Sequence, residues 1–332
     1  MAFEQDLPLE YFYIQTVTDI YYYYTTVIGV LTFLLVPGLF YIIITQSKSL
    51  RNLKWFLLNH NFWLLMAEVT LFIFRPVLIF PYNGIFSIGL LHNISYKTFI
   101  IGGFAALLFI AFAVLGLIWT FAERYIRAFD GFFKYLWESF VLKIGLGLLY
   151  LIVIILIGIY TPTFLNADRD VMKQEGLNMS RSLEIFINEP SFFAVNGESH
   201  KIGDVLVIIF CIGYAGGACV LIIILSWHLH KNRNNTTFIT EKQVTLIVSC
   251  IAEMIILMVF VDLPAFFLFL SLFFEIPYSG PIMTFMICLI MTYPILEFIS
   301  NLYLVDPYKK FVISVLQKGK KINKIISIRQ RI

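Results

Sequence analysis

Seven apolar runs divide this chain of 332 residues, and each is long enough to cross a lipid bilayer as a helix. A helix rises about 1.5 Å per residue, so about 20 apolar residues cross the hydrocarbon core of a membrane. The chain is 60% hydrophobic and 14% charged, which is far from the composition of soluble domains. The sequence therefore predicts an all-α membrane protein, a bundle of seven transmembrane helices. The predicted spans are residues 21–44, 55–80, 99–122, 141–160, 205–227, 244–272 and 282–305.

The third span is predicted to lie at the centre of the bundle. No charge interrupts it between Lys97 and Glu123. Small side chains let the backbones of membrane helices approach closely, and this span carries them on several faces. They are Gly102, Gly103, Ala105, Ala106, Ala111, Ala113 and Gly116.

The distribution of lysine and arginine predicts the orientation of the chain. If the N-terminus is outside, the inner loops and the C-terminal tail hold eighteen of the 24 basic residues, and the outer segments hold five. Cytoplasmic segments of membrane proteins carry such an excess. We therefore expect residues 1–20 to be extracellular, residues 21–305 to form the transmembrane domain, and residues 306–332 to be cytoplasmic.

The outer segments carry two candidate glycosylation sites, Asn93 and Asn178, each followed two residues later by serine. Asn234 and Asn235 also match the acceptor pattern, but this orientation places them on a cytoplasmic loop. The second outer loop, residues 161–203, is the only long connection. Long loops are often functional or mobile, so a lid over an outer pocket and a loose tether both remain open.

Ionisable side chains inside a bilayer are costly and need partners or water. Glu68 and Arg75 are seven residues apart, which places them on one face of the second span. Either a polar network that holds the bundle or contact with a ligand would explain them. Asp262 precedes Pro264 in the sixth span, where a proline permits a hinge. The candidates for a ligand pocket or polar network are Glu68, Arg75, Asp262 and Glu297, and Glu253 also needs a partner.

The segment after the seventh span is predicted to form a short amphipathic helix on the membrane. Asp306 can cap its start and Pro307 suits its first position. Its apolar face would comprise Phe311, Val312, Val315 and Leu316, with lysines around it. These lysines favour contact with anionic lipid, and no nucleic-acid partner is expected.

Several chemistries are disfavoured by the sequence. The seventh span has no lysine for a retinal Schiff base, and the chain has no paired histidine motif for zinc. Cysteine serves as a small apolar residue inside the spans, at Cys211, Cys219, Cys250 and Cys288. We therefore expect no enzyme activity, no cofactor and no metal site.

The layout of the spans, together with Glu123, Arg124 and Tyr125 at the end of the third, resembles a G-protein-coupled receptor. More narrowly, the chain resembles nematode serpentine chemoreceptors of the Str superfamily, nearest to class H (Srh) or class I (Sri). The motif residues that carry this resemblance are Leu57, Leu58, Asn59, His60, Trp63, Arg75, Pro76, Phe80, Pro81, Gly84, Gly89, Pro307, Tyr308 and Lys309.

The resemblance implies a chemosensory receptor of the plasma membrane, with the sensory cilium as a candidate location. It implies that a small molecule binds from the outer side and that a heterotrimeric G protein couples through Glu123, Arg124 and Tyr125. Arg124 has a simpler explanation too, because an arginine at an inner helix end can extend to lipid headgroups. A transporter or channel with seven spans is the alternative from another class. Ligand-dependent nucleotide exchange would favour the receptor, and substrate flux without G protein would favour the transporter.

Overall fold

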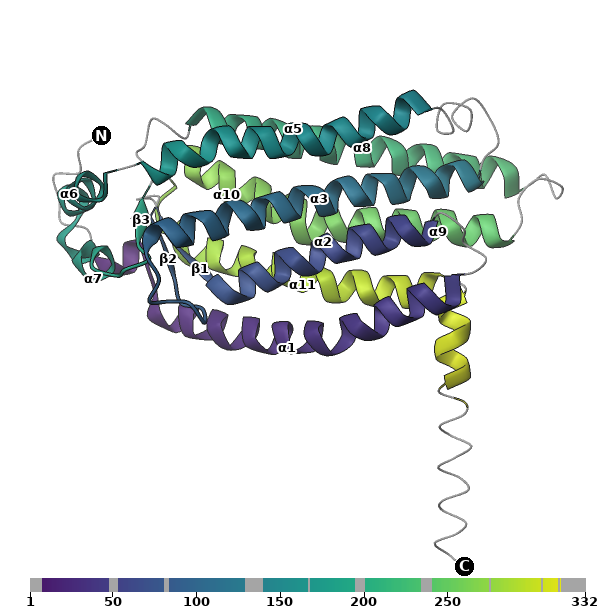
Figure 1. Cartoon of the computed structure of the whole chain (residues 1–332), viewed down its shortest axis with the longest axis horizontal. Coiled ribbons are helices and arrows are strands. Elements are labelled where there is room, and N and C mark those ends of the chain that lie inside the picture. Colours follow the sequence, from purple (N-terminus) through teal and green to yellow (C-terminus); the bar gives the residue numbers. More distant parts are fainter. Residues whose placement is uncertain are drawn as a thin grey trace, which may run out of the picture.

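The computed structural model describes residues 8–47, 53–80, 84–128, 140–166, 168–194, 201–233, 241–274, 276–305, 307–315 and 317. Within these ranges, long helices run side by side along one axis (Figure 1). They are α1 (Gln15–Gln46), α2 (Leu53–Phe74), α3 (Tyr96–Ala128), α5 (Phe140–Leu165), α8 (Lys201–Arg233), the continuous series α9 (Glu241–Leu257), η4 (Met258–Asp262) and α10 (Leu263–Phe274), and α11 (Ser279–Leu304). The predicted spans fall inside these helices, except at the end of the second and, by one residue, of the seventh.

The bundle has two different ends. The end where α1 begins carries a small sheet with α6 (Arg169–Met179) and α7 (Glu184–Ile187), and we call it the cap end (Figure 1). The end where α1 and α11 finish is called the tail end. Pro81, Asn234, Asn235, Asp306 and Leu316 lie outside the described residues.

The second predicted span was too long, because α2 ends at Phe74 instead of residue 80. Arg75 takes a left-handed backbone conformation with a φ of 43°. The residue before a proline is disfavoured in the α conformation, and Pro76 follows directly. The carbonyl of Phe74 accepts hydrogen bonds from the Gly89 amide at 3.1 Å and from the Ser87 hydroxyl. These donors replace the next turn of the helix, and the apolar residues after Arg75 continue as a strand.

A three-stranded antiparallel sheet closes the cap end. It comprises β1 (Pro76–Ile79), β2 (Gly84–Ser87) and β3 (Phe193–Ala194), with Val77 opposite Phe86 and Gly84 opposite Ala194. Because β3 comes from the second outer loop, it ties that loop to the turn after α2. Phe186 of α7 stacks on Phe86 at 5.2 Å between ring centroids. Residues 168–194 of this loop are therefore folded against the bundle, which favours the lid over the tether.

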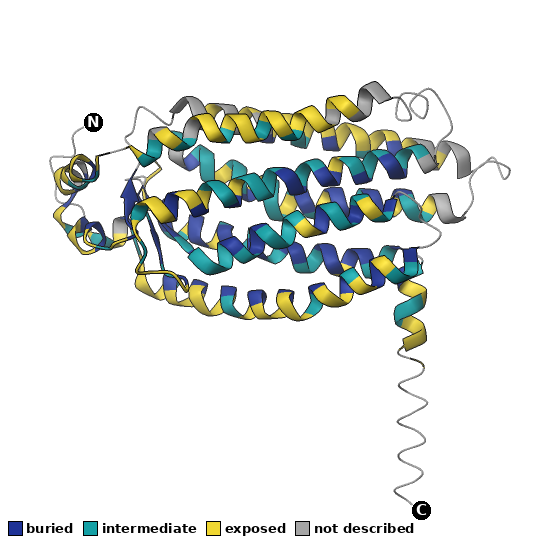
Figure 2. Ribbon diagram, in the orientation of Figure 1, coloured by how far each residue is buried: buried dark blue, intermediate teal, exposed yellow. Residues whose placement is uncertain are grey.

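Burial differs between the helices (Figure 2). The outward faces of α1, α5 and α8 are exposed, and most buried positions lie on α2, α3, α11 and the inward face of α1. Five helical segments of the described chain are long and apolar enough to cross a membrane: Gln15–Gln46, Leu53–Phe74, Tyr96–Ile126, Val244–Ser271 and Ser279–Leu304. Shorter apolar stretches, Gly147–Ile159 and Cys211–Trp227, lie within α5 and α8. Exposed apolar side chains along these helices suit a lipid environment.

Residues 307–315 are helical and turn sharply away from the bundle axis at the tail end (Figure 1). The hydroxyl groups of Tyr308 and Ser47 are 2.6 Å apart, so this helix is tied to the end of α1. Burial raises the pKa of the Tyr308 phenol, although the hydrogen bond with Ser47 opposes the shift. Phe311 and Val312 pack against an apolar cluster that includes Ile43 and Tyr308, whereas Val315 is exposed. The position of this helix along a membrane surface stays a prediction.

Candidate functional site

Arg124 lies in the interior at the tail-end half of α3, with only 1% of its surface exposed. Its Nη1 donates a hydrogen bond to Glu253 Oε1 at 2.7 Å and another to Ser249 Oγ at 3.1 Å. Its Nη2 lies 3.5 Å from Asn301 Oδ1. The guanidinium therefore joins α3 to α9 and α11. This geometry differs from that of a side chain extending to lipid headgroups.

Helical spacing explains why these groups meet. Ser249 and Glu253 are four residues apart in α9, so both face Arg124 from one side of that helix. Glu297 and Asn301 have the same spacing in α11. The Asn301 amide donates to Glu297 Oε1 at 2.9 Å while its own oxygen faces the guanidinium. We call Arg124, Ser249, Glu253, Glu297 and Asn301 the arginine cluster.

His60 extends the arginine cluster toward α2. Its Nε2 lies 3.8 Å from Glu297 Oε1, and its Nδ1 hydrogen-bonds the Ala113 carbonyl of α3 at 2.7 Å. Buried polar groups in a membrane are stable only with such partners. Polar side chains from α2, α3, α9 and α11 thus form one connected interior path.

The other two residues of the predicted coupling triplet lie beside this cluster. Tyr125 packs against an apolar cluster that includes Ile247 and Met254 of α9. Glu123 is also buried, with 7% of its surface exposed. The triplet is therefore part of the packed interior at the tail-end half of α3 and is not an exposed boundary.

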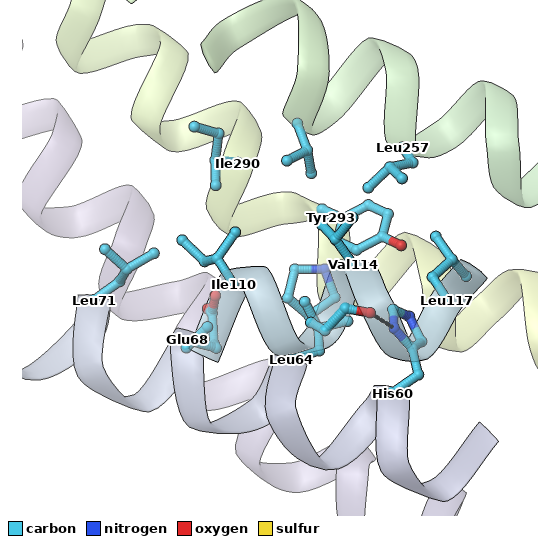
Figure 3. Close-up of a pocket in the computed structure, with 14 residues that line it drawn as sticks. His60, Leu64, Glu68, Leu71, Ile110, Val114, Leu117, Leu257, Ile290 and Tyr293 are labelled. Carbon is cyan, nitrogen blue, oxygen red and sulfur yellow. Dashed lines mark hydrogen bonds between the residues drawn. The ribbon is translucent and has the colours of Figure 1, made fainter. Parts of the chain in front are cut away.

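A small cavity of about 30 Å³ lies between α2, α3, α9 and α11 (Figure 3). His60 and Glu68 reach it from α2 and Tyr293 from α11. Each of these side chains has a buried polar atom without a hydrogen-bond partner: His60 Nε2, Glu68 Oε1 and Tyr293 Oη. A space of this size with several polar partners suits one buried water molecule.

Arg75 lies at the cap end and not next to Glu68. Its guanidinium packs over the rings of Tyr22 and Phe72, at 4.3 Å and 4.5 Å from their centroids. No salt bridge joins Arg75 to Glu68 within the described part of the chain. The same-face expectation failed because the helix ends before Arg75. Cation–π contacts instead hold α1 against the end of α2.

The sixth predicted span contains a π-helical turn immediately before its proline. The Leu263 amide bonds the Met258 carbonyl, five residues earlier, which widens the helix at Met258–Asp262. Pro264 follows directly and is buried. Asp262 lies in the turn beside Cys211 of α8. The candidate hinge thus coincides with a break in regular helix geometry.

A second, larger cavity of about 410 Å³ lies at the cap-end half of the bundle. Its walls come from α2, α3, α5, α10 and α11, and residues of the sheet line it at the cap end. The candidate glycosylation sites lie outside it at the same end. Asn93 is exposed in a turn, and Asn178 is exposed near the end of α6.

The buried polar path and the two cavities lie in the interior of the helix bundle. A comparison with protein families shows which family has this sequence pattern. The family model for the serpentine type 7TM GPCR chemoreceptor Srh matches residues 16–318. The chain belongs to the Srh chemoreceptor family. Comparisons with curated proteins and with solved structures found no match. The match confirms the resemblance and favours class H over class I, and this Srh protein is a multi-pass membrane receptor of a family that is not enzymatic.

Sequence reasoning missed several residues of the Srh arginine cluster. Ser249 and Asn301 carry no charge and stand out in no motif, so their contact with Arg124 had no signal in the sequence. His60 was noticed only as part of a family motif. Its spacing of eight residues from Glu68 placed both on one helical face, and that spacing was the available signal.

Proposed function

We propose that this Srh receptor binds a small molecule at the cap end and activates a heterotrimeric G protein at the tail end. In this proposal the seven helical segments are transmembrane spans, the N-terminus is outside, and the receptor acts in the plasma membrane. The excess of basic residues in the tail-end loops supports this orientation. The family match favours a receptor over a transporter or channel.

The observation that carries the proposal is the buried ion pair between Arg124 and Glu253. It holds α3 against α9 at the tail-end half of the bundle, with N and O 2.7 Å apart. A buried pair is stabilising only while both partners are present, since either charge alone is strongly penalised. Separation of α9 from α3 would leave the guanidinium needing another acceptor. An incoming G-protein helix can supply one through its carbonyl groups.

The ligand can shift the receptor between these states only by its differential affinity for them. The larger cavity touches α10 and the π-helical turn continues α10 into α9. A ligand that repositions α10 therefore acts on the same continuous helix that holds Glu253. Pro264 and η4 form the hinge in this proposal.

Mutation of Arg124 tests the proposal. An activating compound is first found by screening volatile molecules on cells that express the wild-type receptor. Nucleotide exchange on the G protein is then compared at equal surface expression. Arg124→Lys should lose most exchange, because an ammonium lacks the planar fork that reaches Glu253 and Asn301 together. Arg124→Ala should also lose exchange, but it leaves Glu253 buried without a partner and lowers thermal stability.

Two further variants separate coupling from folding. The double variant Arg124→Gln, Glu253→Gln removes both charges, so it should fold more stably than Arg124→Ala and still not couple. Lys309→Ala removes an exposed charge at the same end and should couple like wild type. Wild-type exchange by the double variant would show that the ion pair has no part in coupling.

A further inference from the structure

The larger cavity has the size and the lining of a site for a small ligand. Its volume of about 410 Å³ lies within the range of pockets that enclose small molecules. Phe99 and Ile110 of α3, Phe269 of α10 and Ile287 of α11 contribute to its walls. Aromatic and aliphatic side chains of this kind gain free energy by covering apolar surface of a ligand.

The lining also restricts the chemistry of the ligand. None of the described side chains that line the cavity is charged, and the polar one, Thr70, already donates its hydroxyl hydrogen to the Met66 carbonyl at 2.8 Å. A charged molecule would lose its hydration here without gaining a partner, which is costly. Thr70 can still accept one hydrogen bond. The cavity therefore suits an uncharged molecule that is mostly apolar.

Residues of the sheet line the cavity on its cap side, and exposed residues of α3 line it on the side of the bundle. Strands β1 and β2 cover it with Leu78 and Ile85. On α3, Gly103 and Leu107 line the cavity and are also exposed, with 51% of the Leu107 surface accessible. They are one helical turn apart, and a Cβ added to Gly103 would meet no atom within 4 Å. A side opening in the apolar part of the bundle faces lipid.

The two cavities are separated by a single layer of side chains. Leu71, Ile110 and Ile290 line both of them. A molecule in the larger cavity therefore contacts the same residues that surround the Glu68 and Tyr293 side chains in the smaller one. A ligand in the larger cavity can therefore affect the buried polar path through these shared apolar residues, without a polar contact between the ligand and the path.

We infer that the larger cavity is the ligand site and that it takes an uncharged, predominantly apolar molecule that enters from the bilayer between Gly103 and Leu107. This inference rests on the proposed receptor function for its meaning in signalling. The binding site itself is testable without a G protein. A dissolved, charged molecule arriving through the cap is the alternative that the test must exclude.

Photolabelling of the purified receptor in lipid nanodiscs tests the inference. The probe is trifluoromethyl phenyl diazirine, which is uncharged and partitions into lipid. Labelling of peptides that contain Phe99, Ile110 and Phe269 should saturate as the probe concentration rises. Labelling of Leu34, a lipid-facing residue of α1 with 72% of its surface exposed, should rise without saturation. Unreactive trifluorotoluene should compete at the cavity, and benzenesulfonate should not.

A matched pair of glycine variants locates the site. Gly103→Phe places a ring in the opening and should abolish the saturable labelling. Gly158→Phe is the control, since Gly158 is also exposed, meets no atom within 4 Å, and lies seven residues from the cap-end terminus of its helix, as Gly103 does. It should label like wild type. Size-exclusion profiles check that both variants remain folded, and the competition in wild type decides the question if Gly103→Phe does not fold.

Cavity labelling that never saturates, that benzenesulfonate displaces, or that persists in a folded Gly103→Phe receptor would overturn the inference. These results are independent of the nucleotide-exchange assay. Saturable labelling without any G-protein exchange would leave the site standing and refute the receptor mechanism. G-protein exchange without saturable labelling would leave the receptor mechanism standing and refute the ligand site.

Discussion

Gly116 of α3 lies directly against the backbone of α2. A Cβ built there would lie 2.9 Å from the Cα atom of His60 and 3.0 Å from the Asn59 side chain. Asn59 accepts a hydrogen bond from the Trp63 indole at 3.1 Å and donates one to the Tyr150 hydroxyl at 3.1 Å. The family motif in α2 thus forms the junction between α2, α3 and α5. Glycine at residue 116 is what lets this junction close.

We predict that Gly116→Ala lowers the thermal stability of the receptor. The added methyl group meets backbone, which cannot move aside as a flexible side chain can, and overpacking of this kind costs about 1–3 kcal/mol. Gly103→Ala is the matched control on the same helix, because its methyl group meets no atom within 4 Å. Thermal unfolding in nanodiscs measures both. Equal melting temperatures for the two variants would contradict the close approach.

Individual polar residues show how far a sequence can predict such a site. The cost of burying charge predicted that Glu253 and Glu297 need partners, and the structure supplies them in Arg124 and Asn301. The partner of each residue depends on which helices pack side by side, and the sequence of a single segment does not show this. Glu68 and Arg75 show where such a prediction fails. Their spacing of seven residues predicts one helical face only if the helix continues, and α2 ends at Phe74.

At the scale of elements, short apolar segments are the ones that the sequence describes least well. The residues of β1 are as apolar as those of α2, so composition alone extends the second span through them. The helical runs of more than twenty residues were identified because a strand of that length is rare. The π-helical turn was not predicted, although Pro264 marked its position within a few residues.

We predict that Pro264→Ala tightens the sixth helical segment. Alanine restores an amide donor to the carbonyl of Phe260, four residues earlier, and removes a residue that costs about 3 kcal/mol in a helix interior. Hydrogen exchange of the amides in Met258–Asp262 should slow, and ligand-dependent nucleotide exchange should fall because the hinge is stiffer. Pro37→Ala is the control, since Pro37 lies within α1 and is exposed. Faster hydrogen exchange in η4 of Pro264→Ala would contradict the hinge.

At the scale of the whole molecule, the two proposed functions lie at opposite ends of the bundle, ligand binding at the cap end and G-protein coupling at the tail end. The cap end has a folded sheet and a cavity beneath it, and the tail end has the arginine cluster and the helix of residues 307–315. The buried polar path from His60 to Glu297 and Arg124 lies between them. This division is meaningful only if the cap end faces outward, so orientation is the property on which the mechanism depends.

Glycosylation tests that orientation in intact cells. If the cap end is outside, Asn93 and Asn178 are within reach of the glycosylation machinery and Asn235 is not. Asn93 should be the better acceptor, because it lies exposed in a turn. Asn178 lies in a helix, and the hydroxyl of Ser180 in its acceptor sequence is buried and bonded to Ser182.

Removal of glycans from the wild-type receptor should shift its electrophoretic mobility. The shift should shrink in Asn93→Gln, vanish in the double variant Asn93→Gln, Asn178→Gln, and stay unchanged in the control double variant Asn234→Gln, Asn235→Gln. If the shift instead survives the first double variant and disappears in the control, the bundle has the opposite orientation. The arginine cluster would then lie outside, which rules out the coupling mechanism built on Arg124.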